Sequence, residues 1–242
     1  MFNIDKNILK LTSYSGDKEP GKKISASMFG RDLLEIYLRI KYGVIEKFDM
    51  GANTFGSLVH KGLESMECDN CEKEYSISIK RSDYDLSATI DLIDHENKVI
   101  ADYKFVKRYA FEKFDQYGSY AEQLRFSKYI LSKEDPKYKD YDMYLIMFIK
   151  DFEESSVFKK KEIYPIQYIK VEDTMDTEKK IDLMIEYLNK YIEKDEFPDQ
   201  CSDLFWRRDP HLNRSVPMKC KKYCSYSDFC PYYKAGKVEL EW

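Results

Sequence analysis

The alternation of apolar and polar residues predicts a chain of helices and strands after a polar N-terminal arm at residues 1–23. Four segments carry apolar residues at helical spacing, namely 25–42, 53–66, 117–131 and 177–194. A serine can cap the first of them, and Gly43 is a typical helix stop. The last has a continuous apolar face and is the clearest amphipathic helix of the chain.

Other segments have the composition of β-strands, with frequent β-branched and aromatic residues. They are 73–79, 84–93, 98–106, 142–150 and 162–171. The run at 142–150 is almost entirely apolar, as expected for a buried central strand. Pro165 interrupts the following strand and therefore places it nearer an edge of the sheet. From the second helix onward the predicted order is αβββαβ, which indicates an α/β fold.

Charged residues lie inside the second and third strands, where strand propensity favours apolar residues. They are Asp91, Asp102 and Lys104. If a four-residue turn at 94–97 joins these strands, the two aspartates lie one diagonal step apart on the same side, which Lys104 shares. Two carboxylates so placed could converge on one divalent cation. The alternative is an ordinary charged pair on an exposed sheet face, since Asp-x-Lys also occurs by chance.

Composition describes a globular protein of 242 residues with 43% hydrophobic and 35% charged residues. No apolar run approaches the roughly 18 residues of a membrane helix, and the first residues lack the pattern of a secretory signal. We therefore expect a cytoplasmic protein without a membrane partner. The net charge of −4 argues against indiscriminate coating of nucleic acid, but it allows a local basic groove.

The combination of Asp91 with Asp102-x-Lys104 resembles the signature of the PD-(D/E)XK nuclease superfamily. Upstream, the segment GSLVH ending at His60 is similar to the G-x-x-x-H motif of its RecB-like branch, which includes helicase–nuclease subunits and CRISPR-adaptation exonucleases. The resemblance spans roughly residues 24–231. It implies a restriction-endonuclease-like αβββαβ core at 24–196, with a mixed central sheet flanked by helices.

The same resemblance implies roles for individual residues. The metal ligands for Mg²⁺ or Mn²⁺ would be His60, Asp91, Asp102 and the backbone carbonyl of Tyr103. Lys104 would orient or deprotonate the attacking water, and Gln123 would steer a phosphate or base. Glu64 would support His60 or bind a second ion. Ser127 departs from the family, which has a tyrosine there, and the alternative for His60 is a packed helix histidine.

The last segment, 197–242, concentrates cysteines. Cys220, Cys224 and Cys230 follow the spacing C-x3-C-x5-C, which is similar to the three-cysteine group at the end of many RecB-like nucleases. With Cys201 as the fourth ligand, the resemblance implies a metal-bound cap holding a 4Fe–4S cluster, with Zn²⁺ as the alternative. Cys68 and Cys71 are interpreted as incidental thiols or, less favoured, a second metal site.

Basic and aromatic residues follow the charged hairpin and could track DNA phosphates or stack on bases; they are Lys107, Arg108, Tyr109 and Lys113. We therefore predict a metal-dependent deoxyribonuclease, with an exonuclease favoured over an endonuclease. The first alternative is a non-catalytic nucleic-acid-binding module with a metal-stabilised tail. The second is a regulatory iron–sulfur subunit of a complex with a helicase, recombination or CRISPR-type partner.

Overall fold

The computed structural model describes residues 19–43, 59–151, 164–174, 176–202, 206–209, 214–217, 219–220 and 224–234. These residues form two compact units. Unit 1 contains residues 24–30 and 59–178, and unit 2 contains residues 19–23, 31–43 and 179–234. The division into an arm, a core and a tail stays a prediction. None of the described helices is long and apolar enough to cross a membrane.

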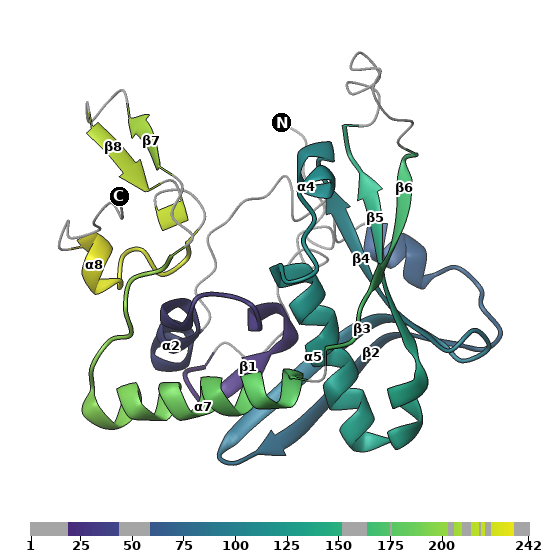
Figure 1. Ribbon diagram of the computed structural model, residues 1–242, viewed down its shortest axis with the longest axis horizontal. Helices are drawn as coiled ribbons and strands as arrows, with labels where there is room; N and C mark the ends of the chain where they lie inside the picture. Colours follow the sequence, from purple (N-terminus) through teal and green to yellow (C-terminus); the bar gives the residue numbers. More distant parts are fainter. Residues whose placement is uncertain are drawn as a thin grey trace, which may run out of the picture. The chain divides into compact units, whose positions relative to one another are not determined.

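A six-stranded mixed sheet is the centre of unit 1 (Figure 1). Its strands are β1 (Lys23–Ser25), β2 (Cys71–Arg81), β3 (Tyr84–Asp94), β4 (Val99–Val106), β5 (Asp142–Ile149) and β6 (Ile166–Val171). The order is β1-β3-β4-β5-β6, and β2 also pairs with β3. β4 and β5 are parallel, whereas β2–β3, β3–β4 and β5–β6 are antiparallel. The expected α/β class and mixed sheet are confirmed.

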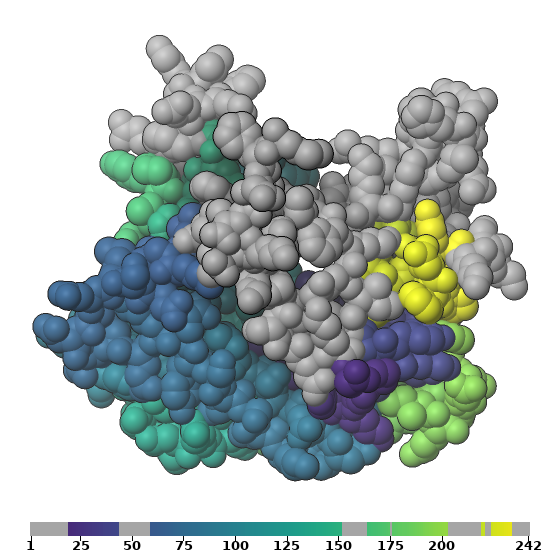
Figure 2. All heavy atoms as spheres, turned by 180° about the vertical axis from the view of Figure 1, so that it is seen from behind, coloured from purple at the N-terminus to yellow at the C-terminus, as the bar shows by residue number. Residues whose placement is uncertain are grey.

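Helix α5 (Ser119–Glu134) makes the crossover between the parallel strands β4 and β5 and packs against the sheet (Figure 1). Its buried apolar side chains include Leu124, Phe126 and Ile130. The helix ends at Asp135, whose carboxylate accepts a hydrogen bond from Lys137 N and so begins the 3-10 helix η2 (Pro136–Asp140). The blue surface in Figure 2 belongs to the part of unit 1 that contains β2 and β3.

Most expected elements occur near their predicted positions. β5 is an interior strand between β4 and β6, and β6 is at an edge, as Pro165 indicated. The first expected helix is wrong in its N-terminal part. Residues Ala26–Met28 form the 3-10 helix η1, and α2 extends only over Leu33–Tyr42. The chain between them includes Gly30 at φ +85°, a conformation that ends helical structure.

Unit 2 contains α2, most of α7 (Thr177–Lys194), the hairpin of β7 (Trp206–Asp209) and β8 (Arg214–Pro217), and α8 (Pro231–Lys234). The bounds predicted for α7 are confirmed, while the hairpin was not expected. Gly43 ends α2 at φ +77°. Its carbonyl accepts a 3.0 Å hydrogen bond from the hydroxyl of Tyr226. This bond ties the Cys-rich segment to the end of α2.

Candidate active site

The β3–β4 hairpin positions the predicted acidic residues. Asp94 pairs with Val99 and Leu92 with Ala101, so the turn occupies residues 95–98 rather than 94–97, and the expected register is wrong by two residues. The Asp94 carboxylate causes this shift, since it accepts hydrogen bonds from the backbone and side-chain nitrogens of Asn97 at 2.9 and 2.8 Å. The turn keeps four residues, and continuing the register places Asp91 directly opposite Asp102.

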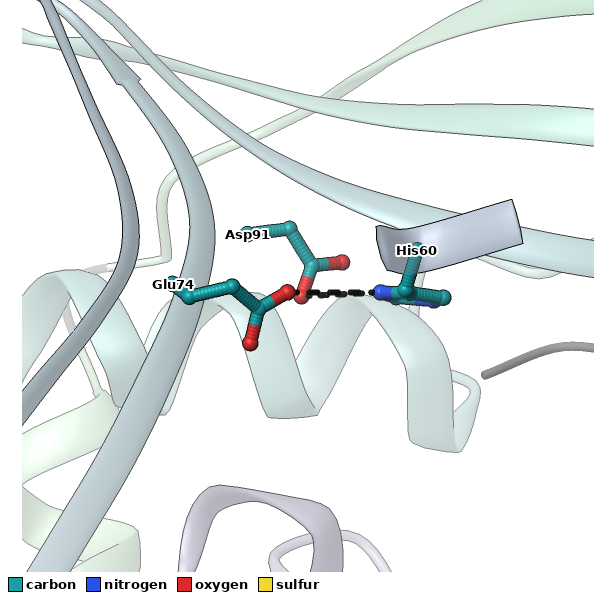
Figure 3. A group of neighbouring side chains, drawn as sticks. All are labelled: His60, Glu74 and Asp91. Atoms are coloured by element: carbon teal, nitrogen blue, oxygen red, sulfur yellow. Dashed lines mark ion pairs between the residues drawn. The ribbon is translucent and has the colours of Figure 1, made fainter. Parts of the chain in front are cut away.

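Three side chains converge beside this hairpin (Figure 3). His60 lies on the helical segment 59–64, Glu74 on β2 and Asp91 on β3. His60 Nδ1 is 3.5 Å from Glu74 Oε1 and 3.6 Å from Asp91 Oδ1. The candidate ligand atoms of all three lie within 4.8 Å of one another, which is compatible with their sharing one cation. We call these residues the His60 triad.

A second group lies on β4 and α5. Lys104 Nζ is 2.6 Å from Asp102 Oδ2 and donates a 3.1 Å hydrogen bond to Gln123 Oε1. Gln123 Nε2 in turn donates to Asp102 Oδ1 at 3.1 Å. Gln123 therefore fixes both the ammonium and the carboxylate in place. Lys104 Nζ also lies 5.4 Å from the centre of the Tyr120 ring.

The two groups meet through Asp91. Its Oδ2 accepts a 2.6 Å hydrogen bond from the backbone amide of Tyr103, the residue between Asp102 and Lys104. Burial, with the nearby charge of Asp102, raises the pKa of Asp91 to about 7. Burial also raises the pKa of Asp102, in spite of Lys104. The contact with Glu74 raises the pKa of His60. Two buried carboxylates and an imidazole thus favour a nearby positive charge.

The fit of this site to a divalent cation rests on its donors. Asp91 and Asp102 are only 9% and 6% exposed, so water does little to solvate the negative charge of their carboxylates. Asp102 Oδ2 is paired with Lys104 by charge, but no described group donates it a hydrogen bond of regular geometry. Carboxylate oxygens with one imidazole are the donor set that Mg²⁺ and Mn²⁺ accept. The residues present therefore fit such an ion.

The structure brings together most of the predicted site residues, but it divides them between two groups. His60 and Asp91 lie together, but the third member of their triad is Glu74, which sequence reasoning missed; Asp102 lies with Lys104 and Gln123 instead. Glu74 could have been found as the charged residue on β2 that falls opposite Asp91. Glu64 is exposed. Gly56, the glycine of the predicted GSLVH motif, lies outside the described residues.

The residues expected to bind DNA lie just after β4. Lys107 is the N-cap of the short helix α4 (Arg108–Glu112). Arg108 forms a 2.6 Å ion pair with Glu112, and its backbone amide donates to Asp151 at 2.7 Å. Lys113 Nζ lies 4.7 Å from the centre of the exposed Tyr109 ring. A DNA-binding role for these residues stays a prediction.

The cysteines of unit 2 are free thiols. Cys220, Cys224 and Cys230 are buried and Cys201 is partly buried. Burial raises the pKa of Cys201, and it raises that of Cys220 to about 11, with Cys224 contributing. No three sulfurs among the described residues lie within 4.8 Å of one another. Cys68 and Cys71 form a disulfide with a Cα–Cα distance of 5.6 Å, so their interpretation as incidental thiols is corrected.

Comparisons with known proteins bear on the fold. No protein-family model matches the sequence, and no curated protein matches it significantly. The solved structure of SSO0001 is similar with a TM-score of 0.54 and 15% identity, covering 94% of this chain and 93% of that one. A phage-related exonuclease from Haemophilus somnus 129PT gives a TM-score of 0.40 and 15% identity over 67% of this chain and 79% of that one. The chain thus shares its fold with SSO0001.

Proposed function

We propose that this protein is a metal-dependent DNA nuclease, an exonuclease in preference to an endonuclease, with a RecB-like PD-(D/E)XK core. The observation that supports it best is the convergence of the His60 triad beside the Asp102–Lys104–Gln123 group. Acidic groups and an imidazole for a cation, with an ammonium directly beside them, are the components that phosphodiester hydrolysis requires.

The ligands that would hold Mg²⁺ or Mn²⁺ are His60 and Asp91, completed by Glu74 or by Asp102 with the Tyr103 carbonyl. When bound, the ion would supply Lewis acidity toward the phosphate and lower the pKa of a coordinated water. Asp91 is positioned for this role by the 2.6 Å hydrogen bond from Tyr103 N, which fixes Oδ2 and leaves Oδ1 toward His60. The backbone of the hairpin therefore orients the ligand.

Lys104 provides the cationic group of this mechanism. Its side chain is 17% exposed and is held by Asp102 and Gln123, so the ammonium is already located when DNA arrives. From there it can orient an attacking water and stabilise negative charge that develops on the phosphate oxygens. Gln123 is a positioning residue, because its side-chain amide hydrogen-bonds both the Lys104 ammonium and the Asp102 carboxylate.

The four cysteines of unit 2 would hold a metal group that stabilises the C-terminal segment. They are free and mostly buried, and Cys224 contributes to the raised pKa of both Cys201 and Cys220, as Cys230 does to that of Cys220. Four thiolates can hold either a 4Fe–4S cluster or Zn²⁺, and we favour the cluster because the C-x3-C-x5-C spacing resembles the terminal group of RecB-like nucleases.

A second candidate is a non-catalytic nucleic-acid-binding or regulatory subunit with the same fold. The ion pair between Asp102 and Lys104 favours it, because a lysine bound this tightly neutralises the carboxylate that a cation would need. Such a subunit would act with a helicase, recombination or CRISPR-type partner. It would bind DNA without cleaving it.

The two candidates differ in turnover. End-labelled single- and double-stranded DNA is incubated with the protein and Mg²⁺ or Mn²⁺, alongside Asp102→Ala, Lys104→Ala and the control Lys80→Ala, an exposed lysine of β2. The nuclease predicts cleavage that the first two substitutions abolish and the control retains. Binding of DNA by all four proteins without cleavage would instead establish the non-catalytic candidate. End-labelling also reports the polarity of the reaction.

A further inference from the structure

Unit 1 contains a cavity of about 440 Å³ that is separate from the candidate active site. It lies between α5, η2 and the segment 173–178. On a helix with about 100° per residue, Arg125, Tyr129 and Ser132 project from the side of α5 opposite to Gln123. The cavity volume is within the range of about 300–1,000 Å³ that small-molecule sites occupy. We call it the α5 pocket.

Two residues lining the α5 pocket have a buried polar atom without a partner. Arg125, which is 2% exposed, uses Nε and Nη1 to donate to the carbonyls of Glu172 and Gln116 at 2.8 and 2.6 Å. Nη1 also contacts the Glu122 carboxylate at 3.0 Å. Its remaining nitrogen, Nη2, has no acceptor among the described residues, and Thr174 Oγ1 likewise has no partner there. Both atoms can donate, so the missing component is a hydrogen-bond acceptor.

The charges around the α5 pocket favour a negatively charged hydrogen-bond acceptor. Its lining includes four cationic side chains, Arg125, Lys128, Lys133 and Lys139, but only two acidic ones, Asp173 and Glu178. Lys128 pairs with Asp173 at 2.8 Å. Glu178 is shared between Lys133 and Arg81, at 3.0 and 2.8 Å. For the exposed Lys139, no ion pair occurs within the described part of the chain, so positive charge is left in excess.

We propose that the α5 pocket binds a small phosphate-bearing anion. A phosphoryl group offers several acceptor oxygens and matches guanidinium and ammonium donors. Tyr129 and Pro136 add apolar surface to the lining, against which a sugar or base could pack. The phosphoryl group could belong to inorganic phosphate or to a nucleoside monophosphate. This pocket does not depend on the proposed nuclease, because none of its lining residues belongs to that site.

Isothermal titration calorimetry of the full chain in EDTA tests the proposal with inorganic phosphate, deoxyadenosine monophosphate and deoxyadenosine. Saturable 1:1 binding of a phosphate-bearing ligand, with none for deoxyadenosine, is the expected result. A monophosphate that binds at least about tenfold tighter than phosphate identifies a nucleotide as the ligand, and equal affinities identify phosphate alone. Absence of saturable binding up to about ten millimolar, or equal binding of deoxyadenosine, would overturn the proposal.

Variants locate the binding. Lys139→Glu should weaken it about tenfold, and Thr174→Val, which removes only the unpartnered hydroxyl, about threefold. The matched control is Lys137→Glu on the same 3-10 helix, because Lys137 pairs with Asp135 and does not line the pocket. Its affinity should stay within about twofold of wild type. If all three variants bind equally well, the ligand is elsewhere and the assignment is wrong.

Discussion

Glu74 lies opposite Asp91 at the position where the β2–β3 ladder is interrupted. Lys73 pairs with Leu92 and Tyr75 with Ile90, while Glu74 itself has a φ of +48°. A non-glycine residue is rarely held in this left-handed conformation, and such residues concentrate at functional sites. The bend brings the Glu74 carboxylate to 3.5 Å from His60 Nδ1 and so completes the His60 triad.

Replacing Glu74 tests its part in cation binding. Glu74→Gln should weaken Mn²⁺ binding about tenfold or more, because it removes one of three converging charged or polar ligands. Mn²⁺ titration monitored by electron paramagnetic resonance measures the affinity. Glu67→Gln is the control, since Glu67 is exposed shortly after the helical segment that carries His60. Equal loss in both variants would argue against a specific role for Glu74.

The backbone of Glu74 allows a separate prediction about stability. Glu74→Gly should weaken Mn²⁺ binding as Glu74→Gln does, yet raise the free energy of unfolding by about 1 kcal/mol, because glycine adopts positive φ without a steric penalty. Urea denaturation in EDTA measures the difference. A variant that is destabilised would show that the Glu74 side chain serves the fold rather than the metal.

The pKa shifts of the site predict how stability depends on pH. Asp91 has a pKa of about 7, above its ordinary value of 3.8, and the pKa values of Asp102 and His60 are also raised. The folded state therefore binds more protons than the unfolded state, so this contribution to the free energy of unfolding decreases as pH rises through about 7. The lowered pKa values of Asp32 and Asp94 act only at more acidic pH.

Urea denaturation of the metal-free protein between about pH 5 and about pH 8 measures this effect. The asparagine of Asp91→Asn cannot release a proton, so the free energy of unfolding of this variant should decrease less with pH than that of the wild type. Asp85→Asn, on the same strand and more exposed, should leave the decrease unchanged. A wild-type protein that becomes more stable across this range would contradict the assigned protonation of Asp91.

Gln123 is predicted to act by holding Lys104 and Asp102. Gln123→Ala should reduce the rate of DNA cleavage about tenfold, whereas Lys104→Ala should reduce it by at least about a thousandfold. The two should differ in mechanism as well as size, since only Lys104→Ala removes the group that contacts the reacting atoms. Single-turnover rates measured against pH separate them. Equal losses would show that Gln123 itself contacts the substrate.

The cysteine assignments predict the metal content of the C-terminal segment. Cys201→Ser and Cys220→Ser should each lower bound iron and visible absorbance and reduce thermal stability, because thiolate–metal bonds contribute directly to folding. Cys68→Ser is the control for iron content and absorbance, which it should leave unchanged, since Cys68 is paired with Cys71 outside this segment. A colourless protein that contains stoichiometric zinc would show that the cysteines bind Zn²⁺ and not a 4Fe–4S cluster.

Local pattern was enough to predict most elements of the sheet. The apolar run of β5 and the proline before β6 correctly indicated an interior and an edge strand, because strand composition reflects burial. Helix α7 was bounded correctly by its amphipathic face. The start of α2 was not, because helical spacing continues through residues whose backbone forms β1 and η1 instead.

The site was harder to predict because it depends on pairing between strands. The motif indicated His60, Asp91, Asp102 and Lys104, but spacing alone could not show that the Asp94 carboxylate moves the turn by one residue. Nor could it show that Glu74 adopts positive φ opposite Asp91. Both features arise from side-chain and backbone geometry that a linear sequence does not specify.

A crystal structure of the protein soaked in Mn²⁺, with anomalous diffraction at the manganese edge, tests the central claim most directly. The account predicts an anomalous peak bound by His60 and Asp91, with Glu74 or Asp102 completing the protein ligands. The peak should disappear in Asp91→Asn crystals. Manganese bound only at other positions, with His60 and Asp91 unliganded, would contradict the proposed metal-dependent nuclease.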